Sequence, residues 1–220
     1  QQLLRDISEE ARRLVAEQYS ALNDVLLPAL EAEDIHILKR GVWTEFQSRW
    51  IEEYFAQQVE PILTPVGLDP SHPFPKILNN SLNFIVDLHA RDAFGLQCRR
   101  AIVQAPRSLP RLNKQPDELS GTGEQNYVFL SSIIHAFVDE LFAGMSIDGC
   151  YQYRVTRNSD LYIDDEEVDD LMRALEGELS ESGYGAAVRL EMAHYCPGEL
   201  ADYLLEQFHL GTSDLYRVEG

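Results

Sequence analysis

The chain has 220 residues with 37 acidic and 18 basic side chains, so its formal net charge is −19. An apolar share of 45% and an aromatic share of 10% exclude wholesale disorder and suffice for one substantial core. The excess of carboxylates argues against nonspecific nucleic-acid binding, which depends on cationic side chains, and no apolar run is long enough to form a transmembrane segment.

A long amphipathic helix is the first predicted element. Apolar residues from Leu4 to Leu26 recur at steps of three and four, which places them on one helical stripe. Pro28 should kink or end this helix, because proline has no N–H and clashes with the preceding turn. One amphipathic helix cannot bury its own stripe, so it must dock on another part of the protein. We place a domain boundary near Glu33, with a helix of an all-α domain in 1–33 and one domain in 34–220.

A second helix should begin at Thr44, which forms a capping-box pattern with Gln47. Phe46, Trp50, Tyr54 and Phe55 would form its aromatic face, and prolines at 61 and 65 would close it. The pattern then predicts strands at Leu82–Leu88 and Leu96–Gln104, a loop at Arg107–Glu124, and a helix that Ser131 or Ser132 caps and Gly144 ends.

The C-terminal third predicts three strands and two helices. The strands are expected at Gly149–Thr156, Ala187–Met192 and Leu215–Val218, and the helices at about Asp165–Ser180, which is strongly acidic, and from Pro197 to Gly211. Strands in adjacent pairs and singly between helices indicate an α+β fold with a mixed sheet packed against helices, not a doubly wound fold.

The best candidates for a binding site are arginines, because a guanidinium donates two parallel hydrogen bonds to phosphate. On the strand at 149–156, Tyr153 and Val155 should face the core and Arg154 should point outward, whereas Arg157 should lie in the turn with Asn158. Arg189 should also point outward from its own strand. The candidate site residues for phosphate or a protein partner are therefore Arg154, Arg157, Asn158 and Arg189. The alternative is that Arg154 and Arg157 pair with nearby carboxylates.

No motif indicates catalysis or a metal. None of the six histidines lies in an HExxH or similar spacing, the acidic run lacks the glycine of a calcium loop, and no phosphate-binding glycine loop is present. Three widely spaced cysteines favour a reducing compartment and free thiols. We therefore predict no catalytic residue and no metal site in this chain. An alternative with different chemistry is a small phosphohydrolase that uses His135 or His194 with the arginines.

Several segments resemble the bacterial polyphosphate kinases of the first type, in the order expected for that family. They are Tyr153–Leu161, His72–Pro75, Asn80–Asn83, Pro106–Arg111, Leu141–Met145 (with Ala143 in place of the usual proline), Ala187–Glu191 and Tyr216–Gly220. The resemblance covers nearly the whole chain. It implies the last helix of an N-terminal helical domain followed by the middle, or head, domain of such an enzyme.

The resemblance also implies a function. The complete enzyme would transfer the γ-phosphate of ATP reversibly to polyphosphate, with Mg²⁺ and a phosphohistidine that lies in domains downstream of this segment. The chain by itself would bind no cofactor, have no kinase activity, and serve subunit association and positioning of the catalytic domains. Its partners would be those domains, a second subunit and polyphosphate. The location implied is the cytoplasm, with membrane association left open for the full-length protein; a free-standing binding module is the alternative.

Overall fold

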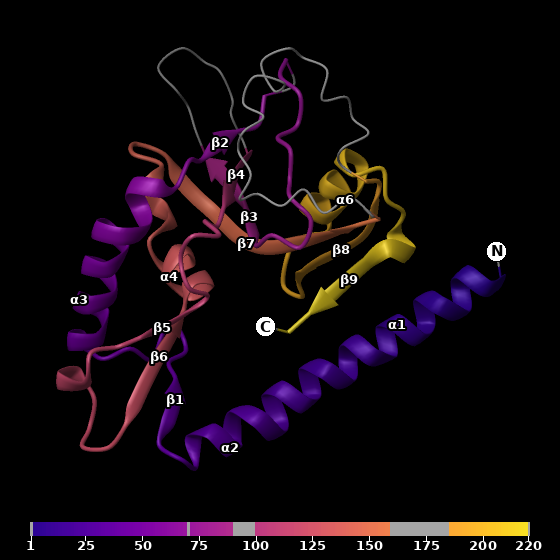
Figure 1. Cartoon of the computed structure of the whole chain (residues 1–220). Coiled ribbons are helices and arrows are strands. Elements are labelled where there is room, and N and C mark those ends of the chain that lie inside the picture. The colour runs from indigo at the N-terminus through magenta and orange to yellow at the C-terminus, as the bar shows by residue number, and fades with distance from the viewer. Residues whose placement is uncertain (1, 70, 90–99, 159–184, 220) are drawn as a thin grey trace, which may run out of the picture.

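A computed structural model of the chain describes residues 2–69, 71–89, 100–158 and 185–219. Its main element is a six-stranded sheet (Figure 1). In sheet order the strands are β2 (Val66–Gly67), β4 (Arg100–Gln104), β3 (Asn83–His89), β7 (Ser146–Arg157), β8 (Ala187–Ala193) and β9 (Leu215–Val218). Neighbouring strands are antiparallel except β8 and β9, which are parallel. The prediction of an α+β fold with a mixed sheet is confirmed.

A second sheet of three short strands was not predicted. It consists of β1 (Ile35–Ile37), β6 (Gln125–Phe129) and β5 (Leu112–Lys114), with β6 in the centre. The loop predicted over residues 107–124 is therefore wrong at β5. Amides occupy inward positions here: Asn113, Gln115 and Asn126 are all buried. Because buried amides replace apolar side chains, the alternation that identifies a strand is missing.

Helix α3 (Glu45–Tyr54) and helix α4 (Leu130–Ala136) cover part of one face of the large sheet. The predicted capping box between Thr44 and Gln47 is present. The predicted aromatic face is only partly correct, since Phe55 is fully buried but Phe46 is 66% exposed. Helix α4 begins one residue before the expected serines and has no side-chain cap, and it ends well before Gly144.

Helix α6 (Gly198–Gln207) covers the opposite face of the sheet. Its buried residues pack on apolar side chains of β3, β4, β7 and β8, namely Ile85, Ile102, Tyr153, Val155, Leu190 and Met192. Pro197 precedes the helix as its N-cap instead of occupying its first turn. His209, at φ 56°, ends the helix before Gly211, and the Leu210 N–H donates to the Leu205 carbonyl at 2.9 Å. This is the Schellman arrangement, with histidine where glycine is usual.

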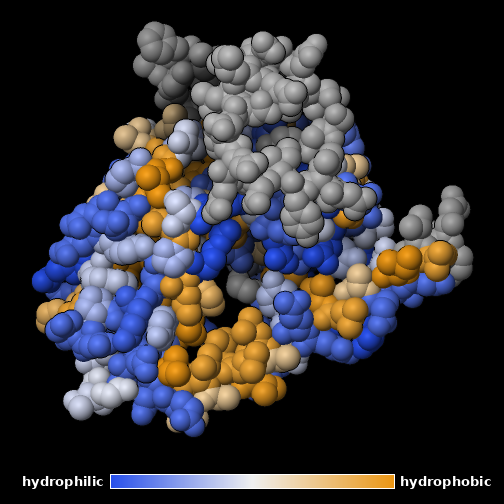
Figure 2. Space-filling model, in the orientation of Figure 1, coloured by the Kyte–Doolittle hydropathy of each residue, from blue (hydrophilic) through white to orange (hydrophobic). Residues whose placement is uncertain are grey.

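The N-terminal helix runs from α1 (Gln2–Ser20) through a π-helical segment (Ala21–Leu26) into α2 (Leu27–Glu31). Pro28 does not end it. The Leu27 N–H bonds the Leu22 carbonyl, five residues back, and this wider turn directly before Pro28 accommodates its ring within the helix. Leu3, Ile7 and other apolar residues of α1 and α2 are exposed, and Figure 2 shows this apolar surface along the helix.

The remaining predicted elements agree with the structure where it describes them. The strands predicted at 82–88, 149–156, 187–192 and 215–218 correspond to β3, β7, β8 and β9. The strand predicted at 96–104 is found from Arg100 onward, and its first residues lie outside the described part. The acidic helix predicted at about 165–180 lies entirely outside the described residues.

Candidate functional site

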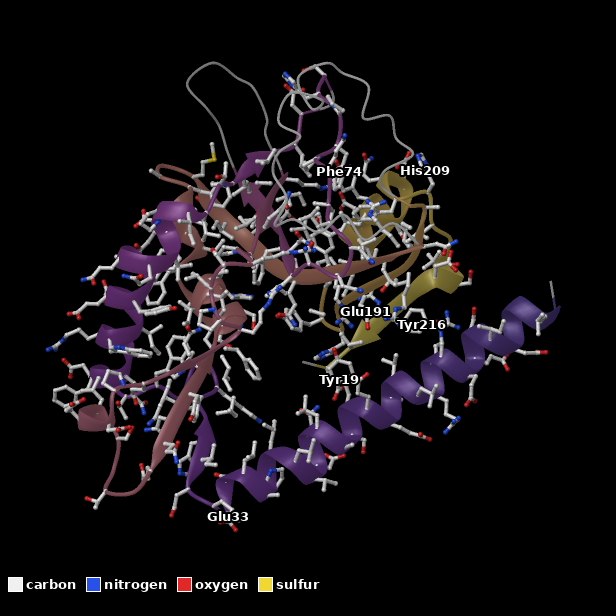
Figure 3. The ribbon with its side chains drawn as sticks, in the orientation of Figure 1. Tyr19, Glu33, Phe74, Glu191, His209 and Tyr216 are labelled. Atoms are coloured by element: carbon white, nitrogen blue, oxygen red, sulfur yellow. The ribbon has the colours of Figure 1, made fainter. Side chains whose placement is uncertain are left out.

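On one face of the large sheet, the side chains change from apolar to charged at β7. Toward β3 and β4 this face is apolar and is covered by α3 and α4. Toward β8 and β9 it carries charged side chains, because Arg154 lies opposite Glu191 in the pairing of β7 with β8, and Thr156 lies opposite Arg189. Figure 3 shows Glu191 and Tyr216 of this part of the sheet near Tyr19 of α1.

Glu191 is the centre of the charged part of the face. The side chain of Glu191 is only 5% exposed, and its Oε2 accepts from the Arg154 Nε at 2.7 Å and lies 2.6 Å from the Arg154 Nη2. The Arg189 Nη2 lies 3.4 Å from the same oxygen. A carboxylate this buried needs cations to offset its lost hydration. Arg154 and Arg189 therefore converge on a carboxylate of the chain itself.

The Tyr216 and Tyr19 side chains lie beside the ion pairs of Glu191 with Arg154 and Arg189. The guanidinium carbon atoms of Arg12 on α1 and Arg189 on β8 lie 5.3 and 5.4 Å from the centre of the Tyr216 ring. Arg12 also donates to the carbonyl of Ser213. Burial raises the pKa of the Tyr19 phenol; Glu191 raises it further, and Arg154 and Arg189 oppose both effects. Helix α1 is thus in electrostatic contact with the charged part of the sheet.

A pocket of about 270 Å³ lies between α1 and this part of the sheet. Its polar lining includes Tyr19, Asn80, Arg111, Arg154 and Glu191. A second pocket of about 490 Å³ continues along α1 beside β9, and the two share Tyr19 and Val218. We call the two together the α1 cleft.

Arg157 and Asn158 do not belong to this cleft. Arg157 is the last residue of β7, not part of the turn as predicted, and it keeps the parity of Tyr153 and Val155. Its Nε donates to the Ile77 carbonyl at 3.0 Å and its Nη1 to the Gly185 carbonyl at 3.1 Å. Its guanidinium lies 5.8 Å from the Phe208 ring. The four predicted site residues therefore lie in two places, and only Arg154 and Arg189 meet.

Sequence reasoning missed Tyr19, Asn80, Arg111 and Glu191. Asn80 adopts φ 54° and its N–H donates to the Val155 carbonyl at 2.8 Å, which holds its segment against β7. The Arg111 side chain remains largely accessible to water, but the loss of part of its hydration and the positive charge of neighbouring Arg107 lower its pKa. Glu191 is two residues after Arg189 on the same strand, so both side chains lie on the same face of the sheet. This spacing was the signal in the sequence that could have placed Glu191 beside Arg154.

Other reactive groups give no second site in the described part of the chain. Among these residues no group of three or more His, Cys, Asp or Glu side chains could hold a metal ion. Burial raises the pKa of the Cys150 thiol to about 12 and that of Cys196 to about 11, which makes both poor nucleophiles. Neither His135 nor His194 is among the described residues that line the α1 cleft.

Among the described residues, no helix combines the length and the apolar character that crossing a bilayer requires.

Comparisons with known proteins agree with one another. The family described as polyphosphate kinase middle domain matches residues 46–220. A polyphosphate kinase of Pseudomonas putida is 55% identical over 219 residues, which cover 100% of this chain and 30% of that protein. One of Neisseria meningitidis is 52% identical over 217 residues, which cover 99% of this chain and 32% of that protein. The crystal structure of polyphosphate kinase from Porphyromonas gingivalis matches at a TM-score of 0.74 and 22% identity, over 98% of this chain and 30% of that one. The chain thus spans about 30% of the length of these relatives.

Proposed function

Because this chain belongs to the polyphosphate kinase family, through its middle domain, we propose that it is the non-catalytic part of an enzyme that transfers phosphate between ATP and polyphosphate. The complete enzyme would work reversibly through a phosphohistidine, with Mg²⁺ and ATP bound by the rest of the protein. The described residues offer no cluster of metal ligands, so they do not fit a Mg²⁺ site of their own.

The observation that carries this proposal is that Arg154, Arg157 and Arg189 bind groups of the chain itself. The Arg154–Glu191–Arg189 cluster joins β7 to β8, and Arg157 joins the end of β7 to Ile77 and Gly185. Phosphoryl transfer requires a positioned nucleophile, a metal and clamps on the transferred phosphate. Arg154, Arg157 and Arg189 instead hold elements of the domain to one another, which supports a positioning role.

Apolar surface supports a role in association. Leu3, Ile7, Leu14, Val25 and Leu26 of the N-terminal helix are each more than half exposed. Contiguous apolar surface of this kind marks protein contacts. We propose that other domains of the parent and a second subunit bind the domain, and that the helix before Glu33 belongs to a separate helical domain. Figure 3 marks Glu33 where α2 gives way to β1.

The compartment we propose is the cytoplasm. Cys150 and Cys196 are both free thiols, as expected of a reducing environment. A phosphohydrolase is less well supported, because neither candidate histidine lines the α1 cleft, where Arg154 lies. A free-standing binding module would use the same surfaces, and the length of the parent reading frame distinguishes it from a family member.

Two assays of the purified 220-residue chain test the proposal. ATP-dependent polyphosphate synthesis with Mg²⁺, with phosphohistidine detection in the same sample, should give no product and no phosphohistidine. Robust synthesis would place the nucleophile within this chain and overturn the non-catalytic assignment. Sedimentation velocity should show a concentration-dependent dimer, and a monomer at the highest soluble concentration would contradict the association role.

A further inference from the structure

We propose that the free edge of β1 binds an extended peptide segment of a separate protein, which adds to the three-stranded sheet as a fourth strand. The peptide lies antiparallel to β1, in a groove between β1 and α2. Binding of such a peptide requires neither kinase activity nor subunit association, so this site goes beyond the function proposed above.

The backbone of β1 has one unpaired side. β1 is an end strand of its sheet and pairs in parallel with β6. The Asp34 carbonyl and the Leu38 N–H both bond the backbone of β6 at 2.8 Å. Because the backbone groups of successive strand residues point to opposite sides, the N–H and C=O groups of Ile35 and Ile37 point away from β6. No strand in the described part of the chain pairs with that side. Such an edge is a template for a further strand.

A groove of about 550 Å³ follows this edge. Side chains from both faces of the strand line it, namely Ile35, His36, Ile37 and Leu38. The groove therefore runs along the edge of β1 and is not confined to one face of the sheet. Its other apolar walls come from α2 and from the segment before α3, with Leu27, Pro28 and Val42. Figure 1 places α2 beside β1, and Figure 2 shows hydrophobic surface over α2.

Two buried amide side chains line the groove. Gln47 is 9% exposed and Asn126 is 4% exposed. The Gln47 Oε1 accepts from the Thr44 N–H at 2.8 Å, so within the described structure its amide nitrogen remains to donate. The Asn126 Nδ2 donates to Gln115 and Ser120, and its Oδ1 remains to accept. A glutamine side chain of the peptide, which both donates and accepts, matches these two groups.

The two ends of the groove carry opposite charges. Exposed carboxylates surround the end where α2 turns into β1: Glu31, Glu33, Asp34 and Glu124. Lys39 and Arg40 follow β1 at the other end. A peptide antiparallel to β1 matches these charges with an acidic N-terminal residue and a basic C-terminal residue. Antiparallel pairing is also slightly more stable per residue than parallel pairing.

A second copy of the chain fits this edge less well. Helix α2 stands beside the free edge of β1, and both elements line the groove. A second copy would bring its own α2 to the same edge, because only the turn at 32–34 joins α2 to β1. An extended segment without a flanking helix enters the groove without that clash. The ligand is therefore an unstructured segment that becomes ordered on binding.

Fluorescence anisotropy of the 220-residue chain with a labelled peptide tests the proposal. The probe is Glu-Thr-Val-Gln-Val-Thr-Lys, blocked at both ends, which sets its valines opposite Ile37 and Ile35 and its glutamine opposite His36. We expect saturable binding. Methylation of both valine nitrogens removes the N–H groups that face β1 and should weaken binding at least about tenfold. Methylation of both threonine nitrogens is the matched control, because those N–H groups point away from β1, and it should leave affinity unchanged.

Two further measurements locate the peptide on the chain. Val42→Glu should weaken binding about tenfold, because it removes an apolar wall and repels the acidic end of the probe. Val188→Glu is the matched control, since Val188 is also exposed but lies on β8, outside the groove. Circular dichroism checks that both variants are folded. In NMR amide exchange, the N–H groups of Ile35 and Ile37 should slow on the order of tenfold when the probe is saturating.

Several outcomes would overturn the proposal. One is an absence of saturable binding at millimolar probe, and another is an equal loss with the two methylated peptides, which would indicate apolar adhesion alone. Protection of Ile35 and Ile37 that rises with chain concentration, without probe, would assign the edge to a second copy. Binding by the 220-residue chain but not by the full-length parent would assign the groove to another segment of that parent. Failure of the probe to bind leaves the non-catalytic assignment intact, since polyphosphate synthesis tests that assignment separately.

Discussion

Helices α6 and α1 lie on opposite faces of the same sheet and are held by different forces. Helix α6 has 10 residues and buries Leu200, Ala201, Leu204 and Leu205 in a continuous apolar core. Helix α1 has 19 residues, and none of its described side chains is buried. The Arg12 guanidinium lies over the Tyr216 ring of β9 and donates to the carbonyl of Ser213, in the turn before β9. Hydrophobic burial holds α6, whereas polar contacts along one edge of the sheet hold α1.

This difference follows from the strands beneath the helices. Toward α6, β7 and β8 present Tyr153, Val155, Leu190 and Met192, all of which are buried. Toward α1 the same strands present Arg154, Arg189 and Glu191. Apolar side chains exclude water and close the interface, but charged side chains leave a hydrated cleft between helix and sheet. The part of this face toward β8 and β9 is therefore not closed by an apolar core, whereas its part toward β3 and β4 is covered by α3 and α4.

The largest effect should come from a cavity beneath α6. We expect Leu204→Ala to lower the free energy of unfolding by about 2–5 kcal/mol, because Leu204 is fully buried and its removal leaves a cavity. Leu14→Ala on α1 is the matched control. Leu14 is 52% exposed, so its effect should stay within about 0.5 kcal/mol. Urea denaturation measures both, and equal losses would contradict the contrast between the helices.

A smaller effect should come from the charged cluster. Glu191→Ala leaves Arg154 and Arg189 without their shared carboxylate, and we expect a loss of about 1–3 kcal/mol. Partial exposure of both arginines to water keeps the loss below that of a fully buried pair. Urea denaturation measures this loss, and a change of less than about 0.5 kcal/mol would show that the cluster adds little to the pairing of β7 with β8.

The smallest effect at neutral pH should come from Tyr153→Phe, on the α6 side. The Tyr153 hydroxyl is buried and has no hydrogen-bond partner among the described residues, so its removal should change stability by only about 0–1 kcal/mol at pH 7. Burial raises the pKa of Tyr153 well above its ordinary value of 10. The unfolded chain therefore releases this proton at a lower pH than the folded chain, and stability should fall as pH rises above about 10. Tyr153→Phe should show a shallower alkaline decline, and an unchanged decline would assign it to other groups.

The part of the fold that was predictable is the part governed by apolar alternation. The outward direction of Arg154 and the buried positions of Tyr153 and Val155 follow from the period of two along β7. The second sheet was missed because Asn113 and Asn126 replace apolar side chains at its inward positions. The π-helical turn before Pro28 has no local sequence signal that we can identify.

The candidate site was less predictable, because it depends on pairing between strands. The sequence places Arg154 and Arg189 on outward faces, but only the register of β7 with β8 sets Glu191 opposite Arg154. Tyr19 reaches the same place from α1, more than a hundred residues away along the chain. The prediction that Arg157 lies in a turn was wrong. The Arg157 guanidinium donates to the carbonyls of Ile77 and Gly185, and these hydrogen bonds allow a charged group on the core side of the strand.

Amide hydrogen exchange of the 220-residue chain tests this contrast between the two helices most directly. We predict that the amides of α6 are protected and that those of α1 exchange on the order of a hundredfold faster, because few contacts oppose local opening of α1. Equal protection of α1 and α6 would contradict the account.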